Sequence, residues 1–126
     1  MEAELSSRRR SPEVRSFIAT RPAWLVVRDA ATVEVIEGLH PGETGAIALA
    51  REIGADRIIL DERRARNAAS DPKRGLNVIG TIGVLEAAAE RGLLDLGEAF
   101  EAVKRTDFWV SHDWLDGRLS RFLARQ

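Results

Sequence analysis

The stretch PGETGAIALAREIGADRIILD, which runs from Pro41 to Asp61, decides the fold. Its first part places apolar residues at helical spacing, and the part from Arg57 to Leu60 is a short apolar run typical of a buried parallel strand. Glu43 therefore opens a helix, and Asp61 ends the strand that follows it. Because strand ends and helix starts converge at one edge of a parallel sheet, we expect both carboxylates to lie within reach of one divalent cation.

Helical patterns alternate with short apolar runs along the rest of the chain. Ser11 and Pro12 are a typical helix N-cap and first helical residue. We expect helices over residues 11–20, 43–53, 62–69, 81–91, 96–105 and 114–125, and strands over residues 24–27, 57–60, 77–80 and 108–111. This alternation predicts an α/β fold with a mainly parallel sheet, in a single domain over residues 1–126. The first expected element is not a strand, so we expect the opening strand of such a fold to be missing.

The composition excludes several classes of function. The net charge of −1 argues neither for nor against a nucleic-acid partner, and the absence of cysteine excludes disulfides and thiolate chemistry. No apolar run approaches the roughly 18 residues of a membrane span, and the N-terminus lacks the apolar core of a signal peptide. We therefore expect a cytoplasmic protein with no membrane partner.

Positive charge is carried mostly by arginine, which suits phosphate contacts better than lysine does. One cluster lies at residues 8–10, and another includes Arg63 and Arg66. Arg63 and Arg66 either contact phosphate or pair with Glu62 or Asp71 at the surface. The residues leave both interpretations open.

Other residues that can carry chemistry give weaker signals. Thr81 follows a glycine and either caps its helix or contacts phosphate. His40 and His112 are isolated and show no metal-ligand spacing, so we assign them no catalytic role. We expect the three tryptophans to pack in the core: Trp24, Trp109 and Trp114.

Three motifs in a fixed order carry a resemblance to a known family. They are Pro41–Ala50, Ala55–Arg66 and Val78–Leu85. Together they resemble the PIN-like nucleases, in a bacterial and archaeal branch of unknown function. The resemblance implies a three-layer α/β/α fold with a mainly parallel sheet and metal-dependent ribonuclease activity, and many relatives of this kind are toxins of toxin–antitoxin pairs.

The resemblance also implies a site made of acids around one or two divalent ions, Mg²⁺ or Mn²⁺. Glu4, Glu43 and Asp61 fall on three of the acidic positions, and Glu62 falls where a second acid often follows the aspartate. The first strand and its aspartate have no counterpart here. The resemblance therefore implies an N-terminally truncated PIN-like fold with weak or no ribonuclease activity. Without the resemblance, each acid has two interpretations. Glu43 is either a metal ligand or an acid that the helix dipole favours in the first turn, and Asp61 is either a metal ligand or a helix N-cap.

Two functions follow from these observations. The first is a metal-dependent endoribonuclease that is the toxin-like component of a toxin–antitoxin pair. Its partners would be RNA, an antitoxin protein and further copies of itself, and the RNA would be contacted by Thr81, Arg63 and Arg66. The alternative is a non-catalytic PIN-like remnant or fragment that acts as a protein-interaction module. A phosphate-binding α/β domain is a third hypothesis, but no glycine-rich phosphate loop supports it.

Overall fold

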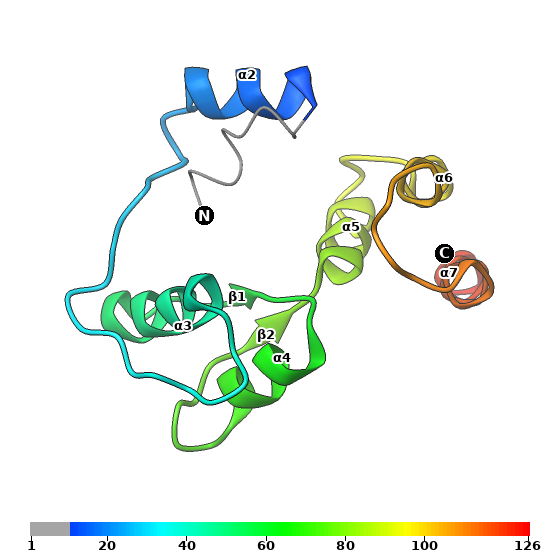
Figure 1. The fold of residues 1–126 in the computed structure, drawn as a ribbon. Helices are drawn as coiled ribbons and strands as arrows, with labels where there is room; N and C mark the ends of the chain where they lie inside the picture. The colour runs from blue at the N-terminus through cyan, green and yellow to red at the C-terminus, as the bar shows by residue number, and fades with distance from the viewer. Residues whose placement is uncertain (1–10) are drawn as a thin grey trace. The chain divides into compact units, whose positions relative to one another are not determined.

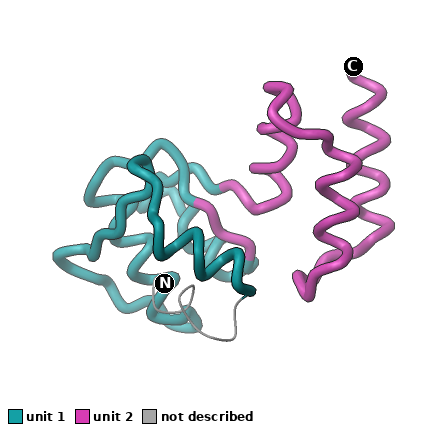
Figure 2. Tube along the Cα trace, turned by 90° about the horizontal axis from the view of Figure 1, so that it is seen from above, with its two compact units in different colours: residues 1–58, 62–78 teal, residues 59–61, 79–126 magenta. Residues whose placement is uncertain are grey.

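The computed structural model describes residues 11–126, which form two compact units. Within these residues the first unit comprises 11–58 and 62–78, and the second comprises 59–61 and 79–126 (Figure 2). Figure 1 shows the elements in chain order: α2 (Pro12–Thr20), α3 (Pro41–Ile53), β1 (Ile58–Ile59), α4 (Arg63–Ser70), β2 (Val78–Ile79), α5 (Thr81–Glu90), α6 (Leu96–Lys104) and α7 (His112–Ala124).

β1 and β2 form a small two-stranded sheet. The Ile58 amide donates to the Asn77 carbonyl at 2.8 Å, and the Leu60 amide donates to the Ile79 carbonyl at 2.9 Å. Both partners advance by two residues in the same direction, so the strands are parallel. The predicted α/β class is confirmed, in a helix-rich chain whose sheet is small.

Two of the expected strands are absent from the described chain, so those two predictions are wrong. Residues 24–27 and 108–111 carry the right apolar composition, but neither segment forms a strand. A strand exists only where a neighbouring strand takes its backbone hydrogen bonds, and composition alone does not supply that neighbour. Trp24 and Val26 are accordingly exposed rather than packed within a sheet.

The helix boundaries follow local signals closely. The Ser11 hydroxyl accepts from the Val14 amide at 3.4 Å, as a helix N-cap does. α3 begins at Pro41, two residues before the expected start, because proline suits the first helical position. It ends at Gly54, whose φ of 65° lies in the left-handed region that glycine adopts without strain.

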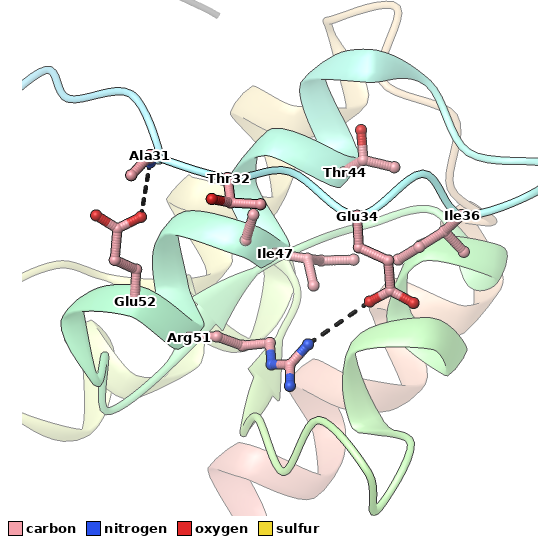
Figure 3. Close-up of a pocket in the computed structure, with 9 residues that line it drawn as sticks. Ala31, Thr32, Glu34, Ile36, Thr44, Ile47, Arg51 and Glu52 are labelled. Carbon is pink, nitrogen blue, oxygen red and sulfur yellow. Dashed lines mark hydrogen bonds and ion pairs between the residues drawn. The ribbon is translucent and has the colours of Figure 1, made fainter.

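In the first unit, ion pairs and a hydrogen bond attach the irregular segment before α3 to α3 and to the turn after α4. The Ala31 amide donates to Glu52 at 2.8 Å, and Glu34 pairs with Arg51 at 3.6 Å and with Arg74 at 3.0 Å. These contacts border a cavity of about 610 Å³ between the segment and α3 (Figure 3). An extended segment is thus fixed over the helix by polar contacts rather than by sheet pairing.

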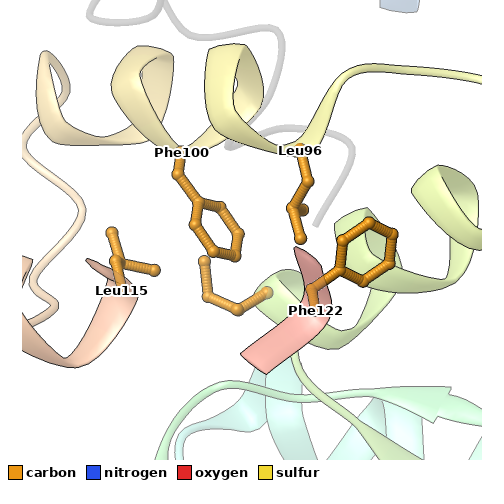
Figure 4. Packing of buried hydrophobic residues seen from close by; sticks show 5 residues of the cluster. Leu96, Phe100, Leu115 and Phe122 are labelled. Atoms are coloured by element: carbon orange, nitrogen blue, oxygen red, sulfur yellow. The ribbon is translucent and has the colours of Figure 1, made fainter. Parts of the chain in front are cut away.

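The second unit has the best-defined apolar core. Its central residue, Phe100, is 1% exposed and packs with four other buried side chains (Figure 4): Ile82, Leu96, Leu115 and Phe122. α5, α6 and α7 each contribute to this cluster, so burial of one apolar face from each helix holds the unit together.

The tryptophans do not pack in the core, so that prediction is also wrong. Trp109 is 93% exposed, Trp24 is 74% exposed and Trp114 is 44% exposed. Phe108 and Val110 pack against the core of the second unit, whereas the intervening Trp109 is exposed. Across residues 11–126, no helix is both long and apolar enough to cross a membrane.

Candidate metal centre

Glu43 is positioned by the start of α3. His40 is the N-cap residue of the helix, and its backbone amide donates to Glu43 Oε1 at 2.9 Å. Glu43 therefore reaches back over the helix start, as the third residue of a capping box does. This contact uses one carboxylate oxygen and fixes the direction of the side chain, which leaves the other oxygen open to a ligand.

Glu62 approaches from a different element. It is the N-cap residue of α4, but its side chain makes no capping hydrogen bond. One ligand atom each from Glu62, Glu43 and the His40 imidazole lies within 4.8 Å of the other two. Two helix starts thus bring two carboxylates and an imidazole together within the first unit.

These three groups fit a divalent cation. Ligands on opposite sides of a Mg²⁺ ion are about 4.2 Å apart, given bond lengths of about 2.1 Å. Three ligands of one octahedral ion also include adjacent pairs, which are about 3.0 Å apart. The atoms of the cluster lie within 4.8 Å of one another, and His40 and Glu62 are exposed, so changes of rotamer can close the cluster around an ion. Two carboxylates suit Mg²⁺ and Mn²⁺, whereas imidazole favours the later transition metals. Mn²⁺ accepts both kinds of ligand and is therefore the ion to use in a binding test.

His40 is a ligand candidate that the sequence analysis missed. It was treated as isolated because no second histidine or cysteine lies at ligand spacing. The usable signal was its position three residues before Glu43 at a helix start, since residues three apart on a helix lie on the same face. The third ligand, Glu62, becomes its neighbour only in the fold.

Asp61 lies in the second unit and has a structural role there. Its Oδ1 accepts from the Thr81 amide at 2.8 Å, and its Oδ2 accepts from the Thr81 hydroxyl at 2.7 Å. Thr81 is the first residue of α5, whose N-cap is Gly80, so Asp61 supplies the cap that glycine cannot. The expected approach of Asp61 to Glu43 stays a prediction.

The remaining candidates are placed as follows. Glu4 lies outside the described residues. Arg63 and Arg66 are exposed in the first turns of α4, and within residues 11–126 neither forms an ion pair with Glu62 or Asp71. The Thr81 hydroxyl donates its hydrogen bond to Asp61.

A comparison with protein families identifies the chain. A family model described as PIN domain matches residues 2–123, which is nearly the whole sequence. The chain belongs to the PIN-domain family. No curated protein and no solved structure matched it. The PIN-like resemblance seen in the three motifs is therefore confirmed, and within residues 11–126 the cluster of His40, Glu43 and Glu62 could hold a metal ion.

Proposed function

We propose that this PIN domain is a divalent-metal-dependent nuclease that hydrolyses RNA phosphodiester bonds. The observation that carries the proposal is the cluster of His40, Glu43 and Glu62, whose ligand atoms lie within 4.8 Å of one another. PIN domains commonly bind divalent metals, and clustered acids repel a phosphate unless a cation neutralises them. The toxin role in a toxin–antitoxin pair and the three-layer arrangement are part of the same proposal.

Each residue of the cluster has a defined task. Glu43 and Glu62 supply carboxylate oxygens, and the imidazole of His40 supplies a nitrogen ligand. The hydrogen bond from the His40 backbone amide fixes the orientation of the Glu43 side chain, so this side chain loses less conformational entropy when an ion binds. A bound divalent ion would polarise a phosphate oxygen and lower the pKa of its water.

Further groups would complete the site. We propose that Asp61 and Glu4 are additional acids for the metal, and that Arg63 and Arg66 hold phosphates of the RNA. The two arginines are three residues apart on α4, so they share one face of the helix that begins beside Glu62. Both are exposed and have no ion-pair partner in the described chain.

The experiment is cleavage of a labelled mixed-sequence RNA in Mn²⁺, with EDTA as the metal-free arm. We expect the cleavage rate of this chain to be low and to fall at least tenfold in Glu43→Gln and Glu62→Gln. The matched control is Glu13→Gln, because Glu13 is also a first-turn acid but lies outside the cluster. Cleavage that persists in EDTA, or that both cluster variants retain, would overturn the proposal.

A second candidate is a protein-interaction module, and a specific apolar surface favours it. A cavity of about 600 Å³ in the first unit is lined mainly by apolar side chains, including Ile18, Val26 and Leu49. Val26 is 72% exposed, and exposed apolar patches of this kind are typical of protein contacts. An antitoxin or a further copy of the chain would cover it.

Sedimentation tests this second candidate. It predicts that the wild-type chain associates and that Val26→Asp weakens the association, because a charge cannot be buried without a partner. Arg57→Asp is the control for added negative charge, since Arg57 is exposed and does not line the cavity. Equal sedimentation of all three proteins would reject the surface as an interface.

A further inference from the structure

One face of α7 combines an exposed aromatic ring with three arginines. Trp114, Arg118, Arg121 and Arg125 are separated by four, three and four residues. With 3.6 residues per turn, this spacing aligns all four side chains along one side of the helix. We call these four residues the α7 stripe. The buried residues of α7, Leu115 and Phe122, occupy a neighbouring side of the helix and attach it to the core.

The stripe borders a recess of about 420 Å³ in the second unit. Arg118, Arg121 and Arg125 line it together with Ala124 and Glu86. Glu86 is the only acid of this lining, and the three arginines leave the recess positively charged. A recess with excess arginine favours an anionic ligand.

Arg118 is the fixed member of the stripe. Its guanidinium pairs with the buried Glu86 through Nε at 3.0 Å and through Nη2, and it lies 5.1 Å from the ring centroid of Trp114. The hydrogen bonds that Arg118 donates to Glu86 raise the pKa of Arg118 above its ordinary value, so the charge is permanent. These contacts hold Trp114 and Arg118 in a defined arrangement on the surface of α7.

Arg121 and Arg125 are the available members. Both are exposed, and within residues 11–126 neither guanidinium has an ion-pair or hydrogen-bond partner. The helix macrodipole favours cations at the C-terminal end of α7, where Arg121 lies in the last turn and Arg125 is the C-cap residue. It does not account for an exposed tryptophan on the same side of the helix.

We propose that the α7 stripe binds single-stranded nucleic acid, with a base stacked on Trp114 and phosphates held by Arg121 and Arg125. Aromatic rings interspersed with cations are the features that single-strand binding surfaces share. A guanidinium group can donate two parallel hydrogen bonds to phosphate oxygens, and an unpaired base can stack on the tryptophan ring. An acidic protein segment would use the arginines, but it has no base to stack on the tryptophan ring beside them.

The test uses the full chain, a fluorescein-labelled 12-nucleotide oligouridylate and fluorescence anisotropy in EDTA. Metal-free conditions separate this surface from the proposed metal centre, so failure of either proposal is visible without the other. Arg121→Gln with Arg125→Gln removes two phosphate contacts. We expect affinity to fall at least fivefold and the slope of log K against log salt to lose about 1.4, at about 0.7 for each phosphate.

Matched controls separate the stripe from general charge and from general loss of tryptophan. Arg15→Gln with Arg57→Gln changes the net charge equally but alters exposed residues of the first unit, and Trp24→Leu removes an exposed tryptophan there. We expect both controls to bind like wild type and Trp114→Leu to bind about five- to tenfold more weakly. Far-ultraviolet circular dichroism checks that each variant is folded.

Two results would overturn the proposal. The first is equal affinity of the Arg121/Arg125 variant and the Arg15/Arg57 variant for the oligonucleotide. The second is binding of a labelled 12-residue oligoglutamate as tightly as the oligonucleotide, with no effect of Trp114→Leu. That second result would assign the surface to an acidic protein segment.

Discussion

Asp61 has a measurable structural role, and this role must be separated from its proposed role in chemistry. Its carboxylate accepts two hydrogen bonds from Thr81, at 2.8 Å from the amide and 2.7 Å from the hydroxyl. Hydrogen bonds to a charged acceptor contribute about 1.5–3 kcal/mol each when shielded from water. Asp61 is exposed, so the value for helix N-caps applies, about 1–2 kcal/mol in total. We therefore expect Asp61→Ala to lower the free energy of unfolding by this amount.

Asp61→Asn has a smaller expected effect. The amide oxygen still accepts from the Thr81 backbone, and the amide nitrogen can donate to the Thr81 hydroxyl oxygen, so the cost is about 0.5 kcal/mol. Asp61→Asn removes the charge while keeping the cap. It is therefore the variant that separates folding from catalysis, and we expect it to abolish metal-dependent cleavage.

Urea unfolding followed by circular dichroism measures these differences. Thr81→Val removes the hydroxyl donor, and the double variant with Asp61→Ala should show a coupling of about 0.5–1 kcal/mol between the two residues. Asp56→Ala is the control, since Asp56 is an exposed acid whose side chain makes no hydrogen bond to another described residue. An unchanged midpoint for Asp61→Ala, or zero coupling to Thr81→Val, would refute the capping role.

Two further predictions concern the second unit. Phe100→Ala should lower the free energy of unfolding by about 3–5 kcal/mol, because Phe100 is 1% exposed at the centre of the core. The control Trp109→Ala should change the urea midpoint little, because Trp109 is 93% exposed. Equal midpoints of the two variants would reject this core. The hydrogen bonds that Lys104 donates to Asp116 and Glu101 raise the pKa of Lys104 above its ordinary value of 10.5. The contribution of Lys104 to stability is therefore complete below pH 10.5 and is lost as the pH rises through the raised pKa. The difference in urea midpoint between wild type and Lys104→Gln should therefore shrink in alkaline solution, and a difference that stays constant above pH 10.5 would contradict this.

The helices could be predicted from sequence because their signals are local. Ser11 and Pro12 mark the start of α2, and Gly54 marks the end of α3, through backbone and capping preferences that need no distant partner. The absence of a strand at residues 24–27 could not be predicted in the same way. The apolar residues of this segment are those of a strand, but sheet pairing depends on a neighbour elsewhere in the chain.

The candidate site was predicted in part for the same reason. Glu43 and Glu62 carry a family pattern and sit at helix starts, so sequence alone selected them. His40 was missed because one of its two neighbours in the cluster, Glu62, lies at the start of α4, about twenty residues away in the chain. The hydrogen bonds between Asp61 and Thr81 also join separate elements, so the sequence left the roles of both residues open.

The central claim is that His40, Glu43 and Glu62 hold a divalent metal ion, and calorimetric titration with Mn²⁺ tests it most directly. Loss of one carboxylate ligand removes both a bond and a charge that attracts the ion, so the effect should exceed tenfold. We predict saturable Mn²⁺ binding by the wild-type chain, at least tenfold weaker binding by Glu43→Gln, and binding by Glu13→Gln equal to that of wild type. Equal Mn²⁺ affinity of Glu43→Gln and wild type would contradict the account.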